Sequence, residues 1–235
     1  MFVYLVLEIF VIFVPLFFSY DRKLKFYLKL KSVAISMLCV GSFYIAGDIL
    51  FTQHAIWGFN PKYHSGIMLL NLPVEEWLFF IVIPYASLFL HDTLVYLFPD
   101  ARLSARQTKI VSIPLVTSLG LIVFFNFQRT YTSSCFTLVI FAILLAKREV
   151  LSRFYLTFII ILVPFFLVNS VLTGSFISEP VVWYNNAETL GIRLFTVPVE
   201  DISYAFSLIL YNLLLINKLE DIFARRPVKG NSFRL

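Results

Sequence analysis

Long apolar runs alternate with short polar segments along the whole chain. A membrane-spanning helix needs about 20 mostly apolar residues, within a range of roughly 17 to 25. Seven stretches meet or approach this length: Phe2–Tyr20, Ser32–Phe51, Pro73–Phe98, Ile110–Phe127, Tyr131–Ala146, Phe154–Thr173 and Pro198–Asn217. The fifth is short and begins with the polar letters TYTSS, so six spans is the alternative. The pattern predicts an all-α integral membrane protein with seven transmembrane helices.

Composition supports this class. The 235 residues are 60% hydrophobic and 14% charged, whereas soluble domains are about half apolar and about a quarter charged. The opening MFVYLVLEIFVIF lacks a basic segment and a cleavage site, so we expect a mature span there and not a signal peptide. Cys39 and Cys135 both lie in apolar runs, and we infer no disulfide.

Basic residues predict the orientation. Sixteen of the 19 Lys and Arg residues follow the first, third, fifth and seventh spans. The alternate loops hold only Lys62, Arg129 and Arg193. Cytoplasmic loops carry the excess of Lys and Arg, so the N-terminus is expected outside and the C-terminus in the cytoplasm. The expected location is the bacterial cytoplasmic (inner) membrane, with membrane lipid around the protein and no nucleic-acid partner.

An internal repeat relates the first three spans to the last three. GIMLLNLPVEEWLFF at 66–80 aligns without a gap with GIRLFTVPVEDISYA at 191–205, an offset of 125. Trp57 aligns with Trp183 at an offset of 126, and FYL at 26–28 recurs at 154–156. This 3+1+3 arrangement places both halves in the membrane in the same direction, as a parallel repeat. The predicted divisions are a first repeat at 1–98, a linker containing span four at 99–130, a second repeat at 131–217, and a basic cytoplasmic tail at 218–235.

Each repeat places two acids at the start of a span: Glu75 and Glu76 in the first, Glu200 and Asp201 in the second. A proline and an acid in the first turn are common structural features of helix starts. Repetition, the second acid and the apolar surroundings favour a functional reading, because ionisable groups held in a membrane are usually functional. We therefore expect the four carboxyls to share one catalytic site, in which at least one stays protonated near neutral pH. Neighbours on a helix diverge by about 100°, so one acid of each pair should brace the helix and the other face inward; the sequence leaves open which.

Aromatic side chains surround these acids. Residues three or four apart share a helix face, so Glu76 should lie above Phe79 and Phe80, and Asp201 above Tyr204. A desolvated aromatic face stabilises a cation by roughly 2 kcal/mol or more. The candidate substrate-binding residues are Trp57, Trp77, Phe79, Phe80 and Tyr204. For each one alone, an interfacial aromatic belt is the structural alternative.

Other polar residues offer weaker candidates. Asp48 ends span two on the same side and either joins the acids or is a solvated helix end. Glu8 and Asn169 are expected to make packing hydrogen bonds. The sequence has no dinucleotide fingerprint and no P-loop. Its three His have no metal-binding spacing, and the last span has no retinal-type Lys, so we expect no cofactor and no metal.

WGFNPKYHSGIMLLNLPVEEWLFF and VPVEDISYAF resemble the membrane-embedded carotenoid cyclases of the heterodimeric type, here with both halves fused. The family's repeated P-x-E-(E/D) motif matches Pro73–Glu76 and Pro198–Asp201, and the resemblance covers essentially the whole chain. SYAF replaces WLFF in the second copy, which leaves open whether both halves contribute equally.

The resemblance implies lycopene β-cyclase activity: the linear ends of lycopene close to β-ionone rings in a redox-neutral isomerisation that gives β-carotene. The lipid-soluble carotenoid would enter from the bilayer, and no flavin is implied. A carotenoid hydratase of the same family and a small membrane transporter are the alternatives. Carotenoid-pathway enzymes or a second copy of the chain are the further partners left open.

Overall fold

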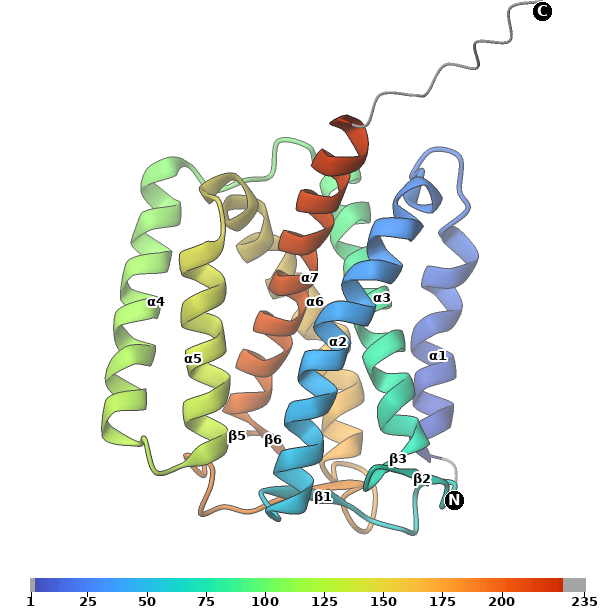
Figure 1. Ribbon diagram of the computed structural model, residues 1–235, viewed down its shortest axis with the longest axis vertical. Coiled ribbons are helices and arrows are strands. Elements are labelled where there is room, and N and C mark those ends of the chain that lie inside the picture. The colour runs from blue at the N-terminus through green and yellow to red at the C-terminus, as the bar shows by residue number, and fades with distance from the viewer. Residues whose placement is uncertain (1–2, 226–235) are drawn as a thin grey trace, which may run out of the picture.

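The computed structural model describes residues 3–225, which form seven α-helices side by side in one bundle (Figure 1). The helices are α1 Val3–Phe18, α2 Leu30–Gln53, α3 Val74–Leu97, α4 Ala105–Phe125, α5 Thr130–Leu145, α6 Arg148–Leu172 and α7 Val199–Arg225, with a short 3-10 helix, η1, at Phe26–Lys29. The predicted all-α class is confirmed. Phe2 and most of the predicted basic tail, 226–235, lie outside the described residues.

Five of the helical segments are long and apolar enough to cross a membrane, whereas α1 and α5 are shorter, with 16 residues each. Apolar side chains such as Phe10, Phe124 and Leu167 are largely exposed on the outside of the bundle. Such a surface suits lipid, since soluble proteins rarely expose large apolar patches. Several helices are longer than the apolar runs that predicted them. For example, α6 begins at Arg148, because helical hydrogen bonding continues through its charged first turns.

All the short strands lie at the end of the bundle where α3 and α7 begin, here called the strand end (Figure 1). Two hairpins lead directly into those helices: β2 (Met68–Leu69) with β3 (Leu72–Pro73), and β5 (Arg193–Leu194) with β6 (Val197–Pro198). A third pair joins the two halves of the chain, because β1 (Trp57–Phe59) runs antiparallel to β4 (Val182–Tyr184).

Backbone bonds around β1 and β4 recur in pairs. The Asn60 N–H donates to the Val181 carbonyl at 2.8 Å, and 125 residues later the Asn185 N–H donates to the Ile56 carbonyl at 2.8 Å. At the centre of the pair, Gly58 faces Trp183. In the fold, Trp183 is therefore the strand partner of Gly58, whereas Trp57 pairs with Tyr184.

Helix α7 forms the centre of the packing. It lies between α5 and α2 in Figure 1 and also contacts α3 and α6. Its side chains Leu208, Ile209 and Leu210 are almost fully buried. In contrast, α4 packs mainly on α5 and α6 and exposes most of its surface. The acids at the start of α7 are therefore held by the most constrained helix of the bundle.

Candidate functional site

Glu75 and Glu200 bind the loops that precede their hairpins. The Glu75 Oε1 atom accepts a hydrogen bond from the Ser65 N–H at 2.6 Å. Glu200 repeats the bond, because its Oε1 accepts from the Leu190 N–H at 2.6 Å and also from the Thr132 hydroxyl at 2.7 Å. Both side chains are almost fully buried. These two acids hold the loops against the helix starts.

Neither acid is needed to cap its own helix. The Val74 N–H at the start of α3 donates to the Ile67 carbonyl at 2.9 Å, and the Val199 N–H of α7 donates to the Ile192 carbonyl at 3.1 Å. A first-turn N–H otherwise depends on a side chain or water. The hairpin supplies this acceptor, so the acids are free to bind elsewhere.

Glu76 and Asp201 point the other way and line one small cavity of about 40 Å³. Glu76 accepts a hydrogen bond from the Tyr4 hydroxyl of α1 at 2.5 Å. Asp201 uses both carboxylate oxygens: Oδ1 accepts from Tyr131 at 2.7 Å, and Oδ2 accepts from Tyr184 at 2.8 Å. The structure thus settles which acid of each pair faces inward.

Of the four carboxyls expected to share one site, the cavity brings together Glu76 and Asp201, one from each half, while Glu75 and Glu200 lie outside its lining. The reason is the divergence of neighbouring side chains around a helix. Asp48 stands behind the cavity wall, fully buried, and accepts a hydrogen bond from Tyr204 at 2.8 Å. It joins the acid cluster and is not a solvated helix end.

Glu8 differs from the packing role expected for it. Its side chain is buried on α1, and neither carboxyl oxygen has a hydrogen-bond partner among residues 3–225. It lies one turn from Tyr4, on the same face of the helix. Asn169 donates to the Phe165 carbonyl at 3.1 Å, as expected of a packing bond, but it also lines the cavity.

The aromatic candidates separate into three groups. Trp57, Phe79 and Tyr204 line the cavity. Phe80 is buried behind it, with its ring centroid 6.4 Å from that of Tyr204. Trp77 is half-buried and does not line the cavity; its indole N–H donates to the Leu69 carbonyl of the hairpin at 3.2 Å. Trp77 therefore fits a structural role in the β2–β3 hairpin.

Three tyrosines of the site were missed by sequence reasoning: Tyr4, Tyr131 and Tyr184. Tyr131 and Tyr184 form an aromatic wall with Trp57, whose ring centroid lies 5.9 Å from that of Tyr131 and 5.8 Å from that of Tyr184. A signal was present, because Tyr4 and Tyr131 each lie near the start of the first apolar run of their half. The acid pairs by themselves point only to α3 and α7.

Tyr184 is the last residue of strand β4 and lies outside the helices. Burial raises the pKa of its hydroxyl well above the usual value, and the nearby charge of Asp201 raises that pKa further. The phenol is therefore protonated at ordinary pH and donates to Asp201.

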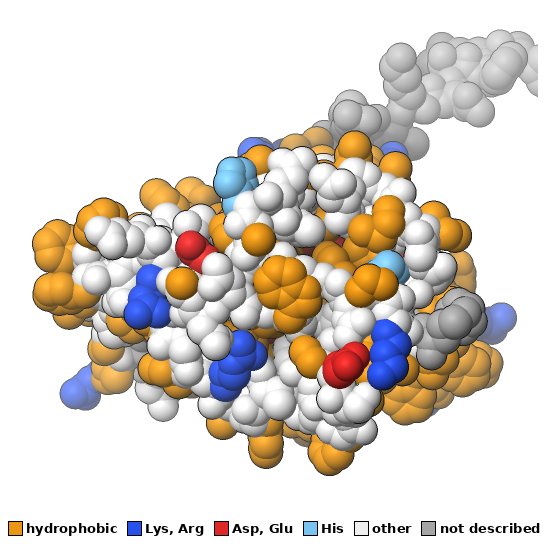
Figure 2. All heavy atoms as spheres, turned by 90° about the horizontal axis from the view of Figure 1, so that it is seen from below, with side chains coloured by type: hydrophobic (Ala, Val, Ile, Leu, Met, Phe, Trp, Pro, Cys, Tyr) orange, Lys and Arg blue, Asp and Glu red, His pale blue; other side chains and the backbone are white. Residues whose placement is uncertain are grey.

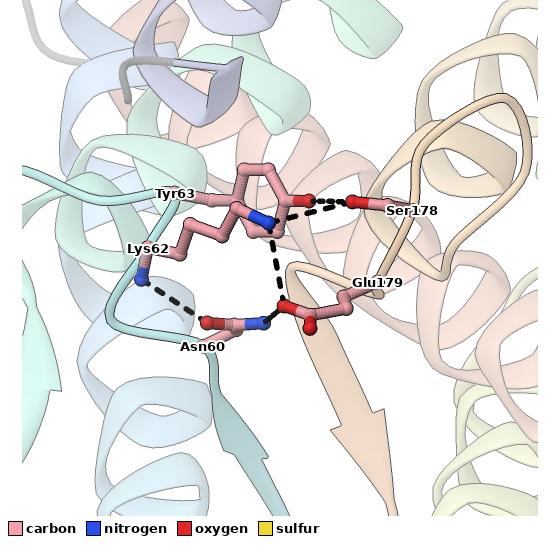
Figure 3. Close-up of polar contacts among 5 residues, drawn as sticks. All are labelled: Asn60, Lys62, Tyr63, Ser178 and Glu179. Carbon is pink, nitrogen blue, oxygen red and sulfur yellow. Dashed lines mark hydrogen bonds and ion pairs between the residues drawn. The ribbon is translucent and has the colours of Figure 1, made fainter.

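Two loops, one from each half of the chain, are joined to each other at the strand end. Figure 3 shows the loop after β1 joined to the loop before β4: the hydroxyls of Tyr63 and Ser178 lie 3.1 Å apart, and the Asn60 amide donates to Glu179 at 3.1 Å. Lys62 lies 3.7 Å from the same carboxylate. Seen from this end in Figure 2, apolar side chains line the rim and also occur near the centre, and charged side chains are few.

The site as a whole can hold an apolar group between two carboxyls and several aromatic faces. Within residues 3–225, no three His, Cys, Asp or Glu side chains gather in a metal-binding arrangement. Acid–base chemistry is what the residues of the cavity supply directly.

The family model described as lycopene cyclase matches residues 1–94 and 128–219. The chain belongs to the lycopene cyclase family. The match includes both acid pairs and omits the whole of α4, in agreement with a fused two-half lycopene cyclase. Comparison with curated proteins and with solved structures gave no match. Family membership identifies an enzyme of carotenoid cyclisation, and the apolar helices make it a membrane protein.

Proposed function

We propose that this cyclase is a lycopene β-cyclase, which closes the linear ends of lycopene to β-ionone rings. The observation that carries the proposal is the placement of Glu76 and Asp201, one from each half, in a single cavity with aromatic walls. An acid, a base and surfaces that stabilise a cation are the three requirements of the reaction.

The reaction conserves atoms and electrons. A carboxylic acid protonates the terminal double bond of lycopene and leaves a tertiary carbocation. The neighbouring double bond attacks this cation, forms the ring bond and moves the positive charge into the ring. A carboxylate then removes a ring proton, and the electrons of that C–H bond form the ring double bond. The product is an isomer of the substrate, so no oxidant or reductant is consumed.

Hydrogen bonding suggests which acid performs which step. Both oxygens of Asp201 accept phenolic hydrogen bonds, which suits a carboxylate. Glu76 accepts one bond through Oε2, and its Oε1 has no partner among the described residues. We assign Glu76 as the proton donor and Asp201 as the base. Trp57, Phe79 and Tyr204 are assigned to hold and stabilise the cation, as lining residues of the same cavity.

The proposed setting is a bacterial inner membrane, with seven spans, the N-terminus outside and the C-terminus in the cytoplasm. The recurring bonds support a parallel repeat: Ser65 to Glu75 recurs as Leu190 to Glu200 at the same spacing of 10 residues. Cysteine labelling from each side of the membrane tests the orientation. In a cysteine-free background, Lys62→Cys should react with an impermeant reagent from outside and Lys109→Cys only from inside.

The decisive experiment is expression in a lycopene-accumulating bacterium, followed by pigment chromatography. The intact chain should produce β-carotene through a one-ring intermediate. A hydroxylated acyclic product would instead identify a hydratase, in which water quenches the same cation. Unchanged lycopene with folded protein in the membrane would overturn the proposal and return attention to transport.

Conservative variants test the two acids. Glu76→Gln and Asp201→Asn should fold and accumulate as the parent does but lose cyclisation. Glu149→Gln is a matched control, because that side chain is 72% exposed and does not line the cavity. Full activity in both cavity variants would refute the assignment.

A further inference from the structure

A second, larger cavity lies on the outside of the bundle. It is a groove of about 750 Å³ between α2, α5 and α7, toward the C-terminal end of α7. Its apolar lining includes Val40 and Phe43 of α2, Leu138 of α5, and Leu214 and Leu215 of α7. The groove is not part of the site described above, and the lining of the two cavities has no residue in common.

The polar residues of the groove are concentrated at one end. Lys147, Asn217, Lys218 and Asp221 lie where α5 ends and where α7 approaches its own end. Long cationic side chains at helix ends commonly extend toward the membrane surface while their apolar stems cover the protein. The body of the groove is therefore a hydrocarbon-lined channel, with its polar end at the membrane surface opposite the strand end.

The deep end of the groove adjoins the candidate active site. Tyr44 lines the groove, and its hydroxyl donates to Ser207 at 2.8 Å. The Tyr44 ring packs edge-on against Tyr204, with centroids 5.0 Å apart. Tyr204 in turn lines the cavity of Glu76 and Asp201. One pair of aromatic rings thus separates the groove from the site.

We propose that this groove holds the polyene chain of the carotenoid whose end reacts between Glu76 and Asp201. The inference rests on the proposed function. The site cavity of about 40 Å³ is close to the volume of one water molecule, so it must widen to admit the reacting end, and the remainder of a long substrate lies elsewhere. A conjugated chain is stiff, and with its end at the strand end it extends toward the opposite membrane surface.

The groove follows this direction. On α7 its lining runs from Tyr211 to Asp221, about 15 Å at 1.5 Å per residue, and Asp201 lies about 15 Å further along the same helix; together they span about 30 Å, the hydrocarbon thickness of a bilayer. Lipid tails are as apolar as the polyene, so affinity comes from shape and close packing. Movement of Tyr44 and Tyr204 would join the groove to the cavity.

Two groove-filling variants test the proposal: Leu138→Trp and Leu214→Trp. Matched controls are Leu38→Trp and Leu144→Trp, which lie on α2 and α5 with 71% and 66% of the residue exposed and do not line the groove. We expect both groove variants to lower the lycopene conversion rate by about tenfold or more, because a displaced chain misplaces its reacting end. The controls should keep the parental rate at equal amounts of folded protein.

Cys39 provides a direct binding measurement, since it is exposed and lines the groove, whereas Cys135 is buried. In nanodiscs containing the inactive Glu76→Gln variant, lycopene should slow modification of Cys39 by N-ethylmaleimide at least about threefold, which corresponds to about 0.65 kcal/mol. If Cys39 is modified equally slowly with and without lycopene, a resident lipid occupies the groove, and the proposal is overturned.

The outcomes separate the two proposals. If the parent fails to convert lycopene, the proposed function is wrong and the groove proposal falls with it. If the parent converts lycopene while groove variants match the controls and Cys39 is not protected, the function stands and the groove proposal alone is wrong.

Discussion

The indole of Trp183 lies directly over Gly58 at the centre of the β1–β4 pair. A Cβ atom added at Gly58 would lie 2.4 Å from Trp183 Cζ2, closer than side chains pack. This contact joins the two halves of the chain above the cavity of Glu76 and Asp201. The glycine is needed for the close approach of the indole and not for its backbone angles.

Gly58→Ala should therefore destabilise the strand end. Overpacking of this kind costs about 1–3 kcal/mol, which a thermal unfolding scan of the purified protein would measure as a lower midpoint. Gly47→Ala is the control, since nothing lies within 4 Å of a Cβ at that position. Restoration of the midpoint in Gly58→Ala with Trp183→Ala would identify the clash as the cause; an unchanged midpoint in Gly58→Ala alone would contradict it.

Removing the phenolic donors should impair catalysis more than folding. Tyr4→Phe deletes the bond to Glu76, and Tyr131→Phe deletes one of the two bonds to Asp201. A hydrogen bond to a charged group contributes about 1.5–3 kcal/mol and one between neutral groups about 0.5–1.5 kcal/mol. Tyr131→Phe should therefore lose about tenfold or more in cyclisation rate, and Tyr4→Phe about fivefold, because Glu76 is assigned as the protonated acid. Tyr155→Phe, which loses only a contact with Ser112, is the control. Equal rates in all three variants would count against the role assigned to these phenols.

Substitution of Glu75 or Glu200, the acids that bind the loops, should impair folding more than catalysis. Glu200→Ala leaves the Thr132 hydroxyl and the Leu190 N–H without their acceptor, and each unpaired buried group costs about 1–3 kcal/mol. We expect a clear loss of thermal stability. Glu75→Ala removes one such bond and should cost less. Glu200→Gln, which retains an acceptor oxygen, should recover part of the loss in stability and keep measurable cyclisation. Complete loss of cyclisation in folded Glu200→Gln would instead place this acid in the chemistry.

The loop contacts of Figure 3 should contribute unequally. Lys62 and Glu179 have side chains that are each 56% exposed, and an ion pair of this kind contributes about 0–1 kcal/mol. A double-mutant cycle with alanine should give a coupling energy in that range. Tyr63→Ala should cost several times more, because that ring is buried between the loops. A larger coupling for the ion pair than the cost of Tyr63→Ala would contradict this ranking.

Alkaline pH should weaken the strand end through Tyr184. The folded state raises the pKa of this phenol above its unfolded value of about 10. The associated stability is therefore fully present below about pH 10 and is lost as pH rises through the folded pKa. Unfolding scans across alkaline pH should show a steeper loss for the parent than for Tyr184→Phe. Parallel pH dependence in the two proteins would contradict the shift.

The sequence by itself determined the helical class and the identity of the candidate acids as a set. Runs of apolar residues near bilayer length leave few alternatives to helices, because unpaired backbone groups are costly in lipid. The repeated P-x-E-(E/D) motif is enough to single out Glu75, Glu76, Glu200 and Asp201, and the family match covers all four. The sequence was sufficient for these two conclusions because the apolar runs and the acid motifs are each features of a single continuous segment.

Only the tertiary structure decided which acid of each pair faces the cavity and which binds a loop. Adjacent side chains on one helix point in directions set by the helix, but which direction is the interior depends on the packing of α1, α5 and the β1–β4 pair. Tyr4, Tyr131 and Tyr184 reach the acids from residues 72, 70 and 17 positions away in the chain, so no local pattern could assign them. The carbonyls of Ile67 and Ile192 accept the first backbone N–H of α3 and of α7, and this pairing also depends on how the hairpins fold against the helix starts. The chemistry is local in sequence, whereas the site is a product of long-range contacts.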